Sequence, residues 1–202
     1  MIGIINYGVG NLQSVKNSLD FLNISNIIVD KPADIKKCAK LILPGVGAFG
    51  PAIEKLNESG FTEKILSFSH QKKPILGLCL GMQLLFDKSL ENGAHKGLGL
   101  IKGDVLPLNK KVKKLPIPLI GWNNVKKNKE SLLINGINKD ATFYFVHSFY
   151  CKPNSNSAII ATTNYGINFA SIVGQNNIFG CQFHPEKSQS AGLQLLKNFN
   201  NL

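Results

Sequence analysis

Cys79 stands between two glycines, in the run Gly77-Leu78-Cys79-Leu80-Gly81. Glycines two residues before and two residues after a nucleophile are what a sharp strand-to-helix turn needs, because side chains there would crowd the neighbouring elements. A thiol at the start of a helix also lies at the positive end of the helix dipole, which favours the thiolate. The pattern therefore predicts a nucleophilic cysteine. The alternative is a small buried core residue, which is what a free cysteine usually is.

A second candidate group is His184-Pro185-Glu186, directly after the apolar segment 178–183. Active sites of α/β proteins gather at the ends of strands. Glu186 could accept a hydrogen bond from the imidazole and hold its tautomer, and Pro185 stiffens the link between them. Taken alone, His184 could equally be an exposed turn residue. Together, Cys79, His184 and Glu186 would form a triad for acyl transfer, with His184 as the general base and acid.

The turn from Pro44 to Gly47 could complete such a site. It follows an expected strand over residues 40–43, and its glycines leave backbone N–H groups free to face a ligand. The N–H of Gly47 and the N–H of Leu80 would then form an oxyanion hole. The alternative is a simple tight turn. A third glycine-rich turn, Gly8-Val9-Gly10, is a weak match to a dinucleotide fingerprint, because Gln13 stands where the third glycine belongs.

The elements that must position these groups can be read from apolar periodicity and turn residues. In the first half we expect strands over residues 2–6, 26–29, 40–43 and 74–78, and helices starting at 12, over 51–57 and 62–70, and from 82 to 86. In the second half we expect short, mainly antiparallel strands over residues 119–123, 132–134, 142–146, 158–162, 169–173 and 178–183, then a helix with Leu195, Leu196, Phe199 and Leu202 on one face. Residues 91–108 look rich in glycine and polar residues. The sum predicts one α/β domain over residues 1–202, with helices flanking a central mixed sheet.

Composition narrows the class of protein. The net charge is +11, but all 23 basic residues are lysine, and bidentate recognition of phosphate or guanine favours arginine, so we predict no nucleic-acid partner. No apolar run approaches the ~20 residues that a membrane span needs, and Met1 to Ile5 has no basic lead typical of a signal peptide. The four cysteines show neither a zinc-binding spacing nor a disulfide framework. We therefore expect no metal, no membrane contact and a cytoplasmic location.

With these residues in view, the chain resembles the class I (triad) glutamine amidotransferases, from Ile2 to the C-terminal helix. Six motifs are similar to those of the glutaminase subunit of imidazole glycerol phosphate synthase. They are Asn6-Tyr7-Gly8-Val9-Gly10-Asn11-Leu12, Pro44-Gly45-Val46-Gly47-Ala48-Phe49, Gly97-Leu98-Gly99-Leu100, Gly121-Trp122-Asn123, Phe143-Tyr144-Phe145-Val146-His147-Ser148 and His184-Pro185-Glu186-Lys187-Ser188.

The resemblance implies a class I glutamine amidotransferase (flavodoxin-like) fold and a glutaminase without a cofactor. Glutamine would be hydrolysed to glutamate, and the ammonia would pass to a (β/α)₈ cyclase subunit in a heterodimer that makes imidazole glycerol phosphate and a purine precursor. It further implies that glutamine is held by Gln83, Ser148 and Phe149, and that Asn11, Trp122 and Lys187 face the cyclase.

Two positions depart from the family pattern. Pro118-Leu119-Ile120 replaces the usual Pro-His-Met, and Phe149 replaces a tyrosine. Because Leu119 and Ile120 adjoin the expected interface, a second partner stays open, an amidotransferase that makes acetamidino sugars for bacterial surface polysaccharides. Two other classes of protein are alternatives. A non-catalytic relative would be expected to lose part of the triad, and a cysteine peptidase would act on a different substrate.

Overall fold

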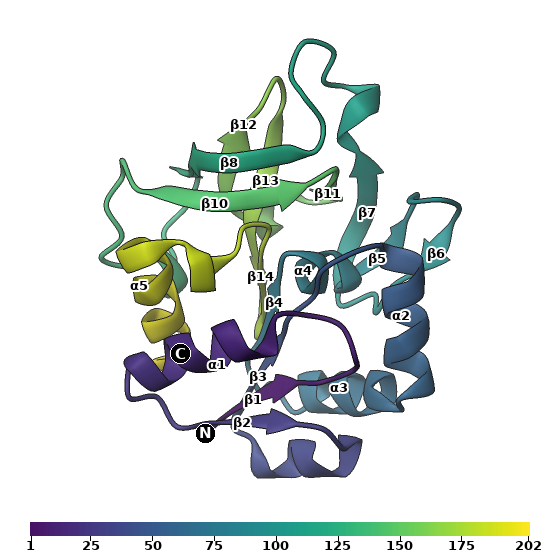
Figure 1. Cartoon of the computed structure of the whole chain (residues 1–202), viewed down its shortest axis with the longest axis vertical. Coiled ribbons are helices and arrows are strands. Elements are labelled where there is room, and N and C mark those ends of the chain that lie inside the picture. The colour runs from purple at the N-terminus through teal and green to yellow at the C-terminus, as the bar shows by residue number, and fades with distance from the viewer.

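The computed structural model describes all 202 residues as an α/β fold (Figure 1). The first half alternates strands and helices: β1 (Ile2–Ile5), α1 (Leu12–Phe21), β2 (Asn26–Val29), β3 (Lys40–Leu43), α2 (Phe49–Glu58), α3 (Phe61–His70), β4 (Ile75–Leu78) and α4 (Leu80–Leu84). The second half is mostly strands: β5 (Phe86–Ser89), β6 (His95–Lys96), β7 (Ile101–Pro107), β8 (Leu119–Asn124), β9 (Lys126–Lys127), β10 (Thr142–His147), β11 (Phe149–Pro153), β12 (Ile159–Asn164), β13 (Asn168–Gln175) and β14 (Ile178–Cys181), followed by α5 (Gln189–Asn200).

The main sheet has eight strands in the order β2-β1-β3-β4-β14-β13-β12-β9. Strands from β2 to β14 run parallel, and β13, β12 and β9 continue the sheet antiparallel. This confirms a mixed sheet at the centre of the fold. Two smaller sheets stand beside it, one in the order β11-β7-β5-β6 and one formed by β10 and β8.

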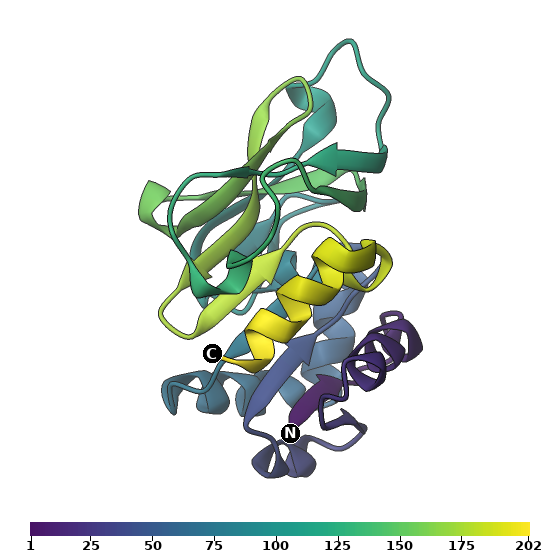
Figure 2. The ribbon, with the colours of Figure 1, turned by 90° about the vertical axis from the view of Figure 1, so that its left-hand side faces the viewer.

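Helices cover both faces of the parallel part of the sheet. Apolar side chains of α2 and α3 pack into one buried cluster, and those of α1 and α5 pack into a second. Figure 2 shows α5, in yellow, lying across the face that it shares with α1. Three of the four apolar positions expected on the last helix are confirmed, since Leu195, Leu196 and Phe199 are fully buried. The helix ends at Asn200, so Leu202 lies beyond it and is half-buried. Burial of such faces is the main force that fixes helices against a sheet.

The arrangement of β4 and β14 decides where the candidate site lies. These strands are adjacent and parallel, with Gly77 opposite Gly180 and Leu78 opposite Cys181. Parallel neighbours end at the same edge of a sheet. Cys79 therefore emerges from β4 beside the segment that carries His184 out of β14.

Two sequence-based expectations were wrong. The helix expected over residues 82–86 is the five-residue α4, Leu80–Leu84, and Phe86 already belongs to β5. The chain turns there because the carbonyls of Leu84 and Leu85 accept hydrogen bonds from Leu98 and Leu100, which tie the segment to a neighbouring loop. Residues 132–134 form a 3₁₀ turn, not a strand, with Ser131 Oγ accepting from Leu133 N at 3.3 Å.

Residues 91–108, for which the sequence analysis noted only a composition rich in glycine and polar residues, contain β6 and β7. In β7, Ile101 and Val105 are fully buried and alternate with exposed or half-buried residues, as one face of a sheet requires.

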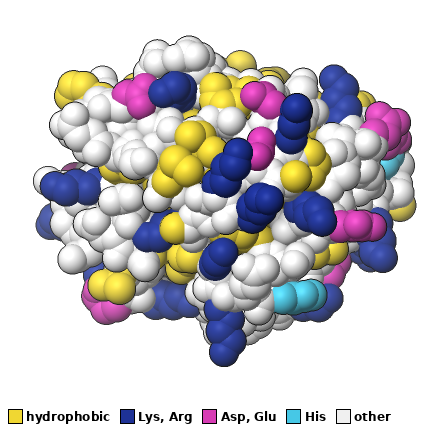
Figure 3. Space-filling view, turned by 90° about the horizontal axis from the view of Figure 1, so that it is seen from below, with side chains coloured by type: hydrophobic (Ala, Val, Ile, Leu, Met, Phe, Trp, Pro, Cys, Tyr) yellow, Lys and Arg dark blue, Asp and Glu magenta, His cyan; other side chains and the backbone are white.

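None of the helices has the length and apolar character to cross a bilayer. The face seen from below carries many lysines and fewer acidic side chains (Figure 3), in keeping with the net charge of +11.

Candidate active site

Cys79 occupies a strained turn between β4 and α4. Its backbone has φ 52° and ψ −110°, a conformation that residues with a side chain rarely adopt. A Cβ on Gly77 would come 2.6 Å from the carbonyl oxygen of Gly81, and a Cβ on Gly81 would overlap the carbonyl oxygen of Leu43. Both glycines are therefore required by close backbone approach. This is the sharp strand-to-helix turn that the sequence predicts.

The imidazole of His184 is held by Glu186. His184 Nδ1 donates to Glu186 Oε1 at 2.8 Å, and both side chains are almost fully buried. The short 3₁₀ turn Pro185–Lys187 brings the two side chains together, with Pro185 at its first position. Because Nδ1 carries the proton, Nε2 is the atom left to accept a proton from a nucleophile.

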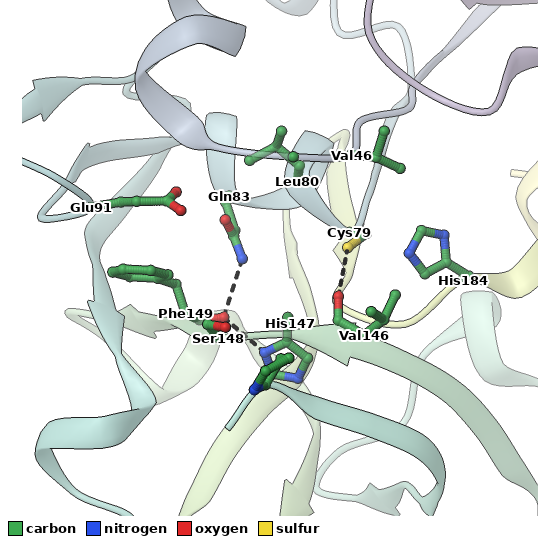
Figure 4. A pocket seen from close by; sticks show the side chains of 12 residues that line it. Val46, Cys79, Leu80, Gln83, Glu91, Val146, His147, Ser148, Phe149 and His184 are labelled. Atoms are coloured by element: carbon green, nitrogen blue, oxygen red, sulfur yellow. Dashed lines mark hydrogen bonds between the residues drawn. The ribbon is translucent and has the colours of Figure 1, made fainter. Parts of the chain in front are cut away.

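His184 and Cys79 form an electrostatic pair. Figure 4 shows the imidazole beside the Cys79 sulfur. Burial disfavours the protonated ring, but the Cys79 sulfur and the Glu186 carboxylate outweigh that effect and raise the pKa of His184 to about 10. His184 Nε2 is buried and has no hydrogen-bond partner in the protein. The arrangement suits an imidazolium that can give its proton to a leaving group.

Both predicted oxyanion residues line the same pocket as Cys79. The pocket has a volume of about 280 Å³ and its walls include Val46, Gly47 and Leu80. Gly47 has φ +89°, and nothing lies within 4 Å of a Cβ built on it. The glycine is therefore required there by its backbone conformation and not by lack of space.

The residues predicted to hold glutamine lie in this pocket too. Gln83, Ser148 and Phe149 all line it. Gln83 Nε2 donates to the carbonyl oxygen of Phe149 at 3.1 Å and to Gln182 Oε1 at 3.2 Å, while no protein group binds Gln83 Oε1. Gln83 therefore offers the pocket an acceptor oxygen.

Two titratable residues of the pocket, Glu91 and His147, were not predicted as site residues from the sequence. Glu91 lies at the end of the pocket away from Cys79 (Figure 4), where its Oε2 accepts from Phe49 N at 2.8 Å at the start of α2. His147 donates from Nδ1 to the Phe149 carbonyl at 2.8 Å. Burial lowers the pKa of His147 to about 4, against the opposing effect of that hydrogen bond, so the ring is neutral near pH 7. The one sequence signal for Glu91 is that it is a charged residue next to a glycine-rich segment.

The three residues predicted to face a partner lie outside the pocket. Trp122 on β8 is 45% exposed and meets the Tyr144 ring edge-on, with centroids 5.9 Å apart. Lys187 Nζ lies 5.8 Å from the centre of the same ring. Asn11 caps α1, accepting from Ser14 N at 3.3 Å, and α1 packs against the turn that contains Lys187. Trp122 and Lys187 thus both lie against the Tyr144 ring, and Asn11 stands at the start of a helix that packs beside the turn of Lys187.

Comparisons with known proteins show the family of the chain and the fold that it shares. The family "Glutamine amidotransferase class-I" matches residues 4–201. The imidazole glycerol phosphate synthase subunit HisH of Chlorobaculum tepidum is 46% identical over 200 residues, covering 98% of each chain. The subunit of the same name from Chlorobium luteolum is 48% identical with the same coverage. A crystal structure of a glutamine amidotransferase superposes with a TM-score of 0.77 at 17% identity, over 98% of this chain and 96% of that one. A structure of PurLQS from Thermotoga maritima superposes with a TM-score of 0.77 at 17% identity, over 99% of this chain and 97% of that one.

Proposed function

The chain belongs to the class I glutamine amidotransferase family, and we propose that it is the glutamine-hydrolysing subunit of an imidazole glycerol phosphate synthase. The observation that carries the proposal is the single pocket onto which Cys79 and His184 open, with Glu186 bonded to His184 behind them. The identity of nearly half the residues to two HisH subunits supports the choice within the family.

The proposed reaction uses Cys79 as the nucleophile. Its thiolate attacks the side-chain amide carbon of glutamine, and the N–H groups of Gly47 and Leu80 stabilise the oxyanion that forms. His184 then gives its proton to the departing nitrogen. The nitrogen leaves as ammonia, and Cys79 is left as a thioester with the rest of the substrate. A water molecule, deprotonated by His184, hydrolyses the thioester to glutamate and restores the free thiol. Glu186 keeps the imidazole oriented and stabilises its charge throughout.

The length of the pocket suits glutamine. The nucleophile stands at one end and the Glu91 carboxylate at the other (Figure 4). Glutamine carries an amide at one end and an α-ammonium at the other, so Glu91 is placed to receive the ammonium when the amide reaches Cys79. Gln83 Oε1 is a second acceptor, and Ser148 and Phe149 line the wall between the two ends. A peptide amide would lack the free ammonium, which favours glutamine over a peptidase substrate.

We propose a (β/α)₈ cyclase subunit as the partner, in a heterodimer to which the ammonia passes. The relatives are named as subunits, and Trp122 and Lys187 place an aromatic and a cationic side chain on the surface beside the triad. Aromatic residues are common at the centres of such interfaces. Asn11 completes this face. The proposal includes a cytoplasmic location, supported by four cysteines that are all free thiols.

The test is glutamate release from glutamine, measured with and without the cyclase and its nucleotide substrate. We expect strong stimulation by the cyclase and its ligand. Hydrolysis that ignores the cyclase would contradict the proposed partner and favour an amidotransferase of acetamidino-sugar synthesis. Complete absence of hydrolysis under both conditions would contradict the glutaminase assignment.

A cysteine variant tests the role of the nucleophile. Cys79→Ala should abolish glutamine-dependent synthesis by the complex and leave ammonia-dependent synthesis unchanged. Cys38→Ala is the matched control, because Cys38 is equally buried but lies at the opposite end of the parallel strands. Loss of both activities in Cys79→Ala would mean that Cys79 has a structural role.

A further inference from the structure

Gln182 is fully buried beside the nucleophile, in the short segment between β14 and His184. Its side-chain Nε2 lies 3.8 Å from Cys79 Sγ, and its Oε1 lies 3.2 Å from Gln83 Nε2. One amide thus connects the sulfur with the glutamine pocket. Neither the proposed triad nor the proposed oxyanion hole includes it.

The direction of these hydrogen bonds is fixed by the carbonyl of Phe149, to which Gln83 is also bonded. The carbonyl oxygen of Phe149 can only accept, and it accepts from Gln83 Nε2 and from His147 Nδ1. Gln83 must therefore turn its nitrogen, and not its oxygen, toward Phe149. The same nitrogen has a second N–H, which points at Gln182, so Gln182 must present its oxygen there.

With its oxygen committed to Gln83, Gln182 has only its NH₂ group to turn toward Cys79. The reverse orientation would place two NH₂ groups against each other around a fully buried side chain, at a cost of several kcal/mol. Apart from His184, the polar group near the sulfur is the carbonyl oxygen of Val146, 3.9 Å away, which a thiol can donate to but which repels a thiolate. Gln182 is therefore the side-chain amide that favours the charged form of the nucleophile.

We infer that Gln182 is a catalytic residue that donates an N–H to Cys79 Sγ and stabilises the thiolate before glutamine binds. The inference rests on the proposed function, since it takes Cys79 as the nucleophile. It also gives Gln83 a second task. Through its nitrogen Gln83 orients Gln182, and through its free oxygen it meets the substrate.

The test is the rate at which iodoacetamide alkylates Cys79 in the free protein, followed by peptide mass spectrometry between pH 5 and pH 9. In Gln182→Leu the rate on the acid side of the pH profile should fall about tenfold, the equivalent of losing one charge-assisted hydrogen bond of roughly 1.4 kcal/mol. The pH of half-maximal rate should move upward. The titratable groups that interact with Cys79, namely His184, Tyr7, Cys151 and Cys181, are unchanged in this variant.

Two further variants separate the donor from mere packing. In Gln83→Leu the Gln182 amide is free to rotate, so alkylation should slow by a smaller factor even though no glutamine is present. Asn198→Leu is the matched control. Its buried Nδ2 donates to Leu133 and Asn135 carbonyls far from the pocket, so it should lose stability but keep the alkylation rate.

If Gln182→Leu does not fold, Gln182→Glu replaces it, because Glu keeps the acceptor for Gln83 and removes the donor to sulfur. Wild-type alkylation rates and an unchanged pH profile in the folded Gln182 variant would overturn the inference. The proposed function has a separate readout in the same experiment. If complete alkylation of wild-type Cys79 leaves glutamine hydrolysis intact, the nucleophile itself was assigned wrongly.

Discussion

Replacing Ser188 by alanine should loosen the attachment of His184 to β10. Ser188 is 1% exposed. Its Oγ donates to the His184 carbonyl at 2.6 Å and accepts from Tyr144 N at 3.0 Å, while His184 N donates to the Tyr144 carbonyl at 2.9 Å. These three bonds close a ring between β10 and the segment that carries the base.

The cost can be estimated from what the variant leaves unpaired. The His184 carbonyl keeps a second bond from Lys187 N at 3.1 Å, so it stays satisfied. The Tyr144 N–H, which points away from β8, loses its acceptor. A buried donor without a partner costs about 1–3 kcal/mol, so we expect Ser188→Ala to lower the free energy of unfolding by roughly 2 kcal/mol.

Denaturant unfolding and steady-state glutamine hydrolysis check this prediction together. Because His184 loses a restraint and the substrate pocket does not, kcat should fall more than KM changes. Ser59→Ala is the control, since Ser59 Oγ makes only one bond, to the Leu56 carbonyl at 3.0 Å, and should cost about 0.5 kcal/mol. A Ser188→Ala protein that matches the control in stability and the wild type in kcat would refute the reasoning.

Three other outcomes follow from the structure. Gly81→Ala should cost about 3 kcal/mol or more, because its Cβ would overlap the Leu43 carbonyl, and an unchanged melting temperature would contradict this. The unfolded chain protonates His147 near pH 6.5 and the folded chain only near 4, so the free energy of unfolding should fall as pH drops through that window, by about 3 kcal/mol. His147→Asn, which does not titrate, should flatten that fall, and denaturation curves at several pH values measure it. Lys187→Ala should weaken the affinity for the cyclase, and the stimulation of glutamine hydrolysis by it, more than it lowers the free energy of unfolding. The reason is that the contact of Lys187 with the Tyr144 ring is worth only about 0.5–1 kcal/mol. Titration of the variant with the cyclase, with glutamine hydrolysis as the signal, measures this.

The sequence predicted the parts of the fold whose signals are local. The strands at residues 26–29 and 40–43 coincide with β2 and β3, since each is a short apolar run bounded by turn residues. The turn at Cys79 was predictable because two glycines at fixed spacing have few other uses. His184 and Glu186 are two residues apart, so their hydrogen bond is also a local feature.

The missed parts depend on contacts that no local pattern records. Strands β5, β7 and β11 are stabilised by pairing in one small sheet, where β7 pairs with both β5 and β11. Gln182 looks like an ordinary polar residue until the register of β14 against β4 places it beside the sulfur. Glu91 lies in a glycine-rich loop, and its role depends on the packing of that loop against α2. Burial and partner identity, which distinguish these residues, are tertiary properties.

One strand, β10, links three parts of the candidate site: the base, the nucleophile and the glutamine pocket. Its Tyr144 backbone holds His184 and Ser188, its Val146 carbonyl lies 3.9 Å from Cys79 Sγ, and its His147 shares the Phe149 carbonyl with Gln83. On its other edge β10 pairs only with β8, which carries the exposed Trp122. A partner that binds Trp122 and the Tyr144 ring therefore contacts a two-stranded sheet and not the eight-stranded one. Any shift of that two-stranded sheet would move the contacts of the base, the nucleophile and the substrate pocket together, which gives a partner surface outside the pocket a direct mechanical route to the chemistry.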